Sequence, residues 1–118
     1  MKKITLLLMI ILLTGYATSQ TAYIPGIDVV ALVRVNPTYP QRAFELGVTG
    51  FCTVYFTITA LGDVRDAYVP YGPEHCSNSV FIQSSIQAIE QFKFWPKIVD
   101  GEAVEIEHAN RFIFALED

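Results

Sequence analysis

The feature that most constrains the fold is a run of alternating side chains at residues 49–60, TGFCTVYFTITA. Successive side chains of a β-strand point to opposite faces of a sheet, so this pattern predicts a strand with one buried face. The following Leu61-Gly62-Asp63 predicts a turn, and VRDAYVPY predicts a second strand, which completes a hairpin. The residues expected to face the core are Cys52, Val54, Phe56 and Ile58.

Two helices are predicted on either side of this hairpin. In NPTYPQRAFELG, residues 36–47, Pro40 suits the first turn of a helix and Gly47 suits its left-handed end, so a short helix of about two turns is expected. Across residues 77–94, apolar side chains recur at spacings of three and four, which predicts a long helix. Pro96 marks its end, because the residue before a proline is disfavoured in the α conformation.

A third strand is predicted after Asp100-Gly101, where AVEIEHANRFIFAL places apolar residues in phase nearly to the end of the chain. The resulting order is helix, strand, strand, helix, strand. It predicts an α+β fold in which a small antiparallel three-stranded sheet packs against one long helix, with a short N-terminal helix.

The N-terminal residues 1–17, MKKITLLLMIILLTGYA, are typical of a signal peptide cut after Ala17. Their apolar run, residues 4–13, would span about 15 Å as a helix, roughly half of a bilayer's hydrocarbon core. Export of the chain is therefore expected. The alternative is an uncleaved segment that anchors the chain in the inner membrane. Residues 18–35 then form an N-terminal arm, and residues 36–118 form the folded domain.

The charge of the chain excludes some partners. Without the leader's Lys2 and Lys3, the formal net charge falls from −4 to −6. Binding of nucleic acid requires a basic face that neutralises phosphates, and this composition does not provide one. Nucleic acid is therefore not expected as a partner.

Cys52 and Cys76 are the only cysteines. An even number of cysteines in an exported chain predicts a disulfide. Closing a loop of about 25 residues would stabilise the fold by roughly 3.5 kcal/mol in the chain-entropy model. The alternatives are a redox pair or metal ligands, although the spacing is not C-x-x-C and no His/Cys quartet is in view.

Enzymatic chemistry has little support in the sequence. His75 and His108 are the only histidines, and they are interpreted as ordinary surface or strand residues. Ser84 and Ser85 fall within the predicted helix, without the sharp glycine turn that presents a nucleophile. Three or four convergent metal ligands cannot be assembled. Neither catalysis nor a metal or cofactor is expected.

Five spaced features resemble the C-terminal domain of the TonB energy transducers. YPQRAFELGVTG is similar to the family's Tyr-Pro, Ala, Gly, Gly opening, and CTVYFTITALGDV is similar to its strand, turn and Gly-x-Val hairpin. FKFWP is similar to its aromatic-basic-aromatic-x-Pro element. The Gly-x-x-Val start and phased phenylalanines of residues 100–116 complete the match, which covers residues 36–116.

The resemblance implies a periplasmic domain that receives an extended peptide of an outer-membrane transporter, or of another periplasmic protein, as an added strand. It places the receiving edge on the last strand, residues 104–114, flanked by residues 36–41. The peptide-binding residues that it implies are Asn36, Thr38, Tyr39, Gln41, Val104, Glu105, Ile106, Glu107, His108, Asn110 and Phe112. The alternative, from another class, is a structural homodimer formed by pairing of two last strands, with no transport role.

Two features depart from the family pattern. Full transducers carry a membrane anchor and a long Pro-rich linker, whereas the arm here is about 18 residues, or about 55 Å when fully extended. In addition, Glu102, Glu105 and Glu107 lie near the expected edge. These acids are expected either to select a basic peptide or to guard the edge against self-association.

Overall fold

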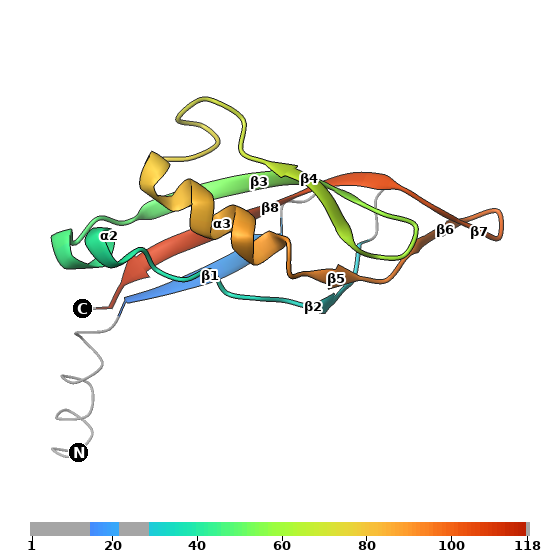
Figure 1. Ribbon diagram of the computed structural model, residues 1–118, viewed down its shortest axis with the longest axis horizontal. Helices are drawn as coiled ribbons and strands as arrows, with labels where there is room; N and C mark the ends of the chain where they lie inside the picture. The colour runs from blue at the N-terminus through green and yellow to red at the C-terminus, as the bar shows by residue number, and fades with distance from the viewer. Residues whose placement is uncertain (1–14, 22–28, 118) are drawn as a thin grey trace, which may run out of the picture.

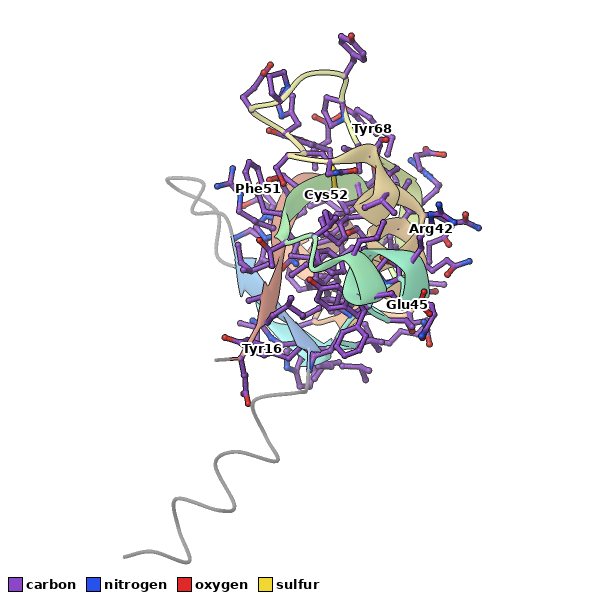
Figure 2. The ribbon with its side chains drawn as sticks, turned by 90° about the vertical axis from the view of Figure 1, so that its left-hand side faces the viewer. Tyr16, Arg42, Glu45, Phe51, Cys52 and Tyr68 are labelled. Atoms are coloured by element: carbon purple, nitrogen blue, oxygen red, sulfur yellow. A yellow bond between two sulfur atoms is a disulfide. The ribbon has the colours of Figure 1, made fainter. Side chains whose placement is uncertain are left out.

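The computed structural model of the chain describes residues 15–21 and 29–117 (Figure 1). Its main layer is an antiparallel sheet whose four strands, in spatial order, are β1 (Gly15–Thr21), β8 (Ile106–Leu116), β3 (Gly50–Ile58) and β4 (Val64–Tyr68). Helix α3 (Ile82–Ile89) lies across one face of this sheet, against β3 and β4. Figure 2 shows Phe51 and Tyr16 on the side of the sheet away from Arg42 and Glu45. The predicted α+β class is confirmed.

Smaller elements surround this layer. Helix α2 (Gln41–Leu46) lies at one end of the sheet, and the 3₁₀ turn η1 (Ser79–Phe81) leads into α3. Strands β2 (Ala31–Val33) and β5 (Lys93–Phe94) form a two-stranded ribbon. Strands β6 (Lys97–Val99) and β7 (Glu102–Val104) form another, which extends past the end of the sheet opposite to α2 (Figure 1). Among the described residues, no helix is long and apolar enough to cross a membrane.

The pairing of β3 with β8 is the centre of the fold. It runs over nine residue pairs, from Gly50 opposite Phe114 to Ile58 opposite Ile106. All four residues predicted to face the core from β3 are buried. From η1, the Phe81 ring stacks on Phe114 at a centroid distance of 4.2 Å. This contact joins the start of the helix to the sheet.

The short helix α2 forms as predicted. Pro40 is its N-cap, and Gly47 ends it in the left-handed conformation with φ 69°. The Val48 N–H then donates to the Ala43 carbonyl at 2.8 Å, which satisfies one of the last free carbonyls of the helix. Buried Ala43 fixes this helix at the end of the core.

The prediction of one long helix over residues 77–94 is wrong. The Asn78 side chain accepts from the Val80 N–H at 3.0 Å and starts η1, but α3 ends at Ile89. Phe92 and Phe94 are both buried. Phe92 follows the turn that ends α3, where its N–H donates to the Ile89 carbonyl at 3.0 Å, and Phe94 lies in β5. The chain there pairs with β2 instead of continuing the helix.

The predicted three-stranded sheet also needs correction. The expected last strand is divided at Glu105 into β7 and β8. A fourth strand, β1, pairs with β8 from Gly15 opposite Leu116 to Thr21 opposite Asn110. The expected cut after Ala17 therefore falls inside a strand. Residues 1–14 of the expected leader and residues 22–28 of the expected arm lie outside the described residues.

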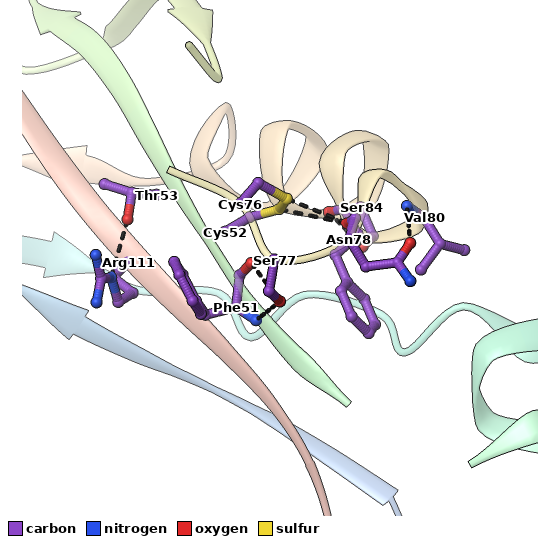
Figure 3. The surroundings of a disulfide bond; sticks show 10 residues. Phe51, Cys52, Thr53, Cys76, Ser77, Asn78, Val80, Ser84 and Arg111 are labelled. Carbon is purple, nitrogen blue, oxygen red and sulfur yellow. Dashed lines mark hydrogen bonds between the residues drawn. A yellow bond between two sulfur atoms is a disulfide. The ribbon is translucent and has the colours of Figure 1, made fainter. Parts of the chain in front are cut away.

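The predicted disulfide joins Cys52 of β3 to Cys76, in the loop before η1 (Figure 3). Backbone hydrogen bonds flank it on both sides, from Thr53 to the His75 carbonyl at 2.6 Å and from Ser77 to the Phe51 carbonyl at 2.9 Å. The Phe51 N–H also donates to the Ser77 hydroxyl at 2.9 Å. The bridge thus fixes the loop that positions α3 on the sheet.

Removing this bridge should weaken the fold without changing it. The double substitution Cys52→Ala with Cys76→Ala should lower the free energy of unfolding by about 3 kcal/mol, since the denatured chain regains the entropy of an open loop. Urea unfolding of the variant and the oxidised wild type gives the difference. Equal stability would contradict the structural role of the bridge.

Gly62 offers a second test, with Gly101 as its matched control. Both have positive φ, 88° and 82°, but a Cβ at Gly62 would overlap the Phe94 carbonyl oxygen, whereas at Gly101 it meets nothing within 4 Å. Gly101→Ala should cost only the backbone strain, about 1 kcal/mol. Gly62→Ala should cost at least about 2 kcal/mol more, because the Gly62 carbonyl also accepts from the Phe94 N–H. Thermal unfolding that ranks the two variants equally would contradict this contact.

Candidate functional site

The candidate site is the flank of β8 that faces away from β3, here called the β1-facing flank and comprising residues 110–116. The other flank of β8 pairs with β3 over residues 106–114. The sequence led us to expect an open edge here, and the structure corrects this, because β1 covers the flank with seven residue pairs. β8 is therefore an interior strand of the sheet (Figure 1).

The residues expected to bind peptide are spread along β8 and do not form one cluster. Val104 and Glu105 lie where β7 meets β8, at one end. Residues 36–41 lie at the other end, where the Tyr39 ring contacts Phe114 at a centroid distance of 5.7 Å. The nine residues from Ile106 to Phe114 span about 27 Å. A ligand touching both groups has to be extended along the strand.

At the α2 end, Tyr39 is a packing residue. Its hydroxyl donates to the Val48 carbonyl at 2.6 Å, and its ring makes edge contacts with Phe44, Phe81 and Phe114. Desolvation by these neighbours raises the pKa of its hydroxyl. Tyr39 thus fixes the segment before α2 against the end of β8.

The other three residues of that segment that were expected to bind peptide, Asn36, Thr38 and Gln41, face the solvent. Asn36 and Thr38 are exposed, and the Gln41 side chain donates to the Glu45 carboxylate at 2.9 Å. Sequence reasoning placed them beside the last strand, and they adjoin it through Tyr39.

Glu105 is directed toward β4, away from the β1-facing flank. Its two carboxylate oxygens accept from the Arg65 guanidinium at 2.7 and 2.8 Å. This hydrogen bond and the charge of Glu105 raise the pKa of Arg65. The neighbouring Glu107 remains exposed on the open face of the sheet.

His108, Asn110 and Phe112 are buried on the helix-covered face. The His108 ring makes an edge contact with Phe56 at a centroid distance of 5.7 Å, and burial lowers its pKa. These side chains build the core and do not project from the flank. What β8 offers to a guest strand is therefore its backbone.

The opposite edge of the sheet, β4, is a poor place for an added strand. Its pairing with β3 shifts register between Tyr55 and Thr57, and Asp66 has a positive φ of 56°. Arg65 and Asp66 place charges on this short strand and form an ion pair at 3.1 Å. Irregular backbone and charges are the means by which sheet edges avoid further pairing.

Sequence reasoning missed a hollow of about 690 Å³ formed by β3, β4 and β8. Two tyrosines and two acids stand in its lining, which comprises Tyr55, Phe56, Thr57, Asp66, Tyr68, Ile106, Glu107 and His108. The sequence signal for it was the set of β3 side chains that alternate with the core-facing ones. Their outward direction was predicted, but the shape of the surface that they form was not.

On the same face of the sheet, the Arg111 guanidinium covers the Phe51 ring at 4.4 Å and donates to the Thr53 hydroxyl at 2.9 Å.

Ser84 and His75, which were considered for catalysis, make local contacts, whereas the Ser85 hydroxyl is buried without a hydrogen-bond partner among the described residues. The Ser84 hydroxyl donates to the Phe81 carbonyl at 3.3 Å, and Ser85 is fully buried in α3. His75 contacts the Tyr55 ring and lies 3.5 Å from the Glu74 carboxylate. Within residues 15–21 and 29–117, no group of three or more His, Cys, Asp or Glu side chains is placed to hold a metal ion.

Comparisons with known proteins match most of this chain. The family of Gram-negative bacterial TonB protein C-terminal domains matches residues 35–116. Protein TonB of Pseudomonas aeruginosa is 30% identical over 90 residues, which cover 76% of this chain and 25% of that protein. The chain thus aligns with about a quarter of this curated relative. The solution NMR structure of the Pseudomonas aeruginosa TonB CTD has a TM-score of 0.63 at 26% identity, covering 83% of this chain and 96% of that one.

The burial of His108 predicts a pH dependence of stability. Its lowered pKa means that the folded chain resists a proton that the unfolded chain accepts below about pH 6.5. The free energy of unfolding should therefore fall as the pH is lowered from 7 to 5. His108→Gln, which cannot gain this charge, should reduce the fall. Urea unfolding at each pH measures it, and an unchanged slope in the variant would contradict the assignment.

Proposed function

Because the chain belongs to the family of Gram-negative bacterial TonB protein C-terminal domains, as its sequence resemblance indicated, we propose that it is a periplasmic module that captures an extended peptide by strand addition. The peptide is a segment of an outer-membrane transporter or of another periplasmic protein. The module serves TonB-dependent transport, and its role is binding rather than catalysis.

The observation that best supports this proposal is the strand that already lies on β8. β1 comes from a distant part of the chain and pairs with β8 over seven residues. On its other flank, β8 is held by β3, and its buried phenylalanines are held by η1 and Tyr39. The β1-facing flank can therefore change partner while the contacts of β8 with β3, η1 and Tyr39 stay in place, although the core residue Ala17 leaves with β1. Backbone hydrogen bonds would supply affinity to any guest strand there.

Exposed acids at the β7 end of β8 favour a guest with basic side chains at that end. Arg65 neutralises Glu105, whereas Glu102 and Glu107 remain exposed. A guest with Lys or Arg near these two acids would gain at most about 1 kcal/mol, since the acids are solvated. Main-chain pairing therefore dominates, and charge adjusts register and partner choice.

The alternative function, a homodimer through two last strands, would use the same flank and would also require β1 to leave. No contact of the described residues favours it over peptide capture. Sedimentation at increasing concentration should find a monomer, and a concentration-dependent dimer that also excludes peptide would favour the alternative.

Titration of the ¹⁵N-labelled chain with peptides from the periplasmic segments of TonB-dependent outer-membrane transporters tests the proposal. Amide shifts should change along residues 110–116 and 15–21 and stay unchanged along residues 64–68. A matched peptide with a central proline should bind at least tenfold more weakly, since it loses a ladder hydrogen bond and cannot adopt the strand conformation freely. Shifts confined to β4, or equal binding of the proline peptide, would contradict strand addition on β8.

A further inference from the structure

The packing of strand β1 against β8 indicates which guest strands the flank accepts. We infer that β1 is a built-in ligand of β8, and that the flank selects an antiparallel strand with very small residues at two alternate positions facing the core. A guest has to displace β1 to bind. This inference rests on the proposed function, since it concerns the same flank of β8.

The first selective position is that of Gly15, opposite Leu116. A Cβ placed on Gly15 would lie 2.7 Å from Phe44 Cδ1 and 2.9 Å from Leu116 Cδ2. Both distances are below van der Waals contact, and Phe44 is held in place by the Tyr39 ring. A side chain here would have to displace the Phe44 ring and the end of the Leu116 side chain.

The second selective position is that of Ala17, opposite Phe114. Ala17 is 6% exposed and belongs to the hydrophobic core, where Phe81 already stacks on Phe114. Overfilling a packed site of this kind typically costs 1–3 kcal/mol. Between the two positions, Tyr16 is 41% exposed on the opposite face (Figure 2), so the flank exerts little size selection there.

β1 is suited to being replaced. Its sequence, GYATSQT, combines Tyr and Thr, which favour strands, with Gly, Ala, Ser and Gln, and its core-facing Gly15 and Ala17 bury little apolar area. It competes as an attached segment, however, and attachment gives it an effective concentration of the order of millimolar. The apparent affinity for a free guest is therefore its affinity for the open flank multiplied by the fraction of molecules in which β1 is undocked.

Cleavage at the expected processing site would favour the guest over β1 in this competition. A cut after Ala17 would remove Gly15, Tyr16 and Ala17, which occupy the flank opposite residues 114–116. Only residues 18–21 of β1 would remain. Removal of the leader would thus vacate both selective positions and raise the affinity for a guest.

The test loosens β1 in the full-length chain, leader included, purified in mild detergent. Successive strand amides point to opposite sides, so Ser19→Pro with Gln20→Pro removes an amide that faces β8, whichever of the two it is. Ser19→Ala with Gln20→Ala is the matched control. The probe is a synthetic peptide of residues 15–21.

The proline variant should bind the probe at least tenfold more tightly than the alanine control. Hydrogen exchange should speed up at alternate amides of residues 110–116 in the proline variant and slow again with probe. The intervening amides, which face β3, should stay protected and so report that the core is folded. Equal probe affinity of the two variants would overturn the inference.

A cross-linked variant gives the converse result without weakening any strand. Thr18 and Ile113 are register partners, so Thr18→Cys with Ile113→Cys should form a disulfide that locks β1 on β8 and abolishes probe binding. In the control, Thr18→Cys with Ala109→Cys, the second cysteine lies about 13 Å further along β8 and should not cross-link. Undiminished probe binding by the locked chain would overturn the inference.

The size rule is tested on the probe itself, with the proline variant as receptor. Ala17→Leu in the peptide should weaken binding at least tenfold, whereas Tyr16→Leu should change it less than threefold. Equal losses would overturn the selection by size.

Transporter peptides separate this inference from the proposed function. Probe binding that follows the rules above, without binding of any transporter peptide to the proline variant, would leave the inference standing and refute the transport role. Transporter peptides that bind the wild type and the proline variant equally would support the role and refute β1 as a competitor.

Discussion

The structure depends on the pairing of β3 with β8. Nine residue pairs bring the hairpin strand at the middle of the chain beside the last strand, and they align Cys52, Val54 and Phe56 with the aromatic core of β8. The disulfide then fixes the loop before η1, and Phe81 closes the core on Phe114. Most of this core lies between one face of β8 and the helix, and β1 contributes Ala17 to it. The β3–β8 pairing, the disulfide and the Phe81–Phe114 contact do not involve β1.

The side chains and the backbone of β8 have different roles, so this one strand can support the core and also bind a guest strand. The side chains of His108, Asn110 and Phe112 point into the core, while the backbone of the same strand presents hydrogen-bonding groups to its flank. In this structure β1 satisfies those groups from Asn110 to Leu116. A guest therefore exchanges the hydrogen bonds of β1 for its own. Backbone pairing holds any guest strand there, and the difference in affinity between guests depends on how their side chains fit beside Phe44, Leu116 and Phe114.

Much of the fold could be predicted from the sequence, since its signals are local. The alternation around Cys52 identified β3, Gly47 identified the end of α2, and the even cysteine count identified the disulfide. The limits are also physical: Phe92 continues the helical spacing of residues 81–89 and also alternates with Phe94 as on a strand, and the pairing of residues 93 and 94 with β2 decides between the two. β1 could not be predicted, because GYATSQT resembles the end of a leader and its partner strand lies about 90 residues away. The hollow beside Tyr55 is lined by Asp66, where φ is positive and the register of β3 with β4 shifts, and this irregularity has no sequence signal of its own.

The central claim is that the β1-facing flank of β8 is where an extended guest chain binds. Isotope-filtered NOE spectroscopy with a labelled transporter peptide measures this most directly. The account predicts Hα–Hα contacts between the peptide and residues 110–116 in antiparallel register, together with loss of the contacts from residues 15–21. Peptide contacts on β4 or on the open face, with β1 still paired to β8, would contradict it.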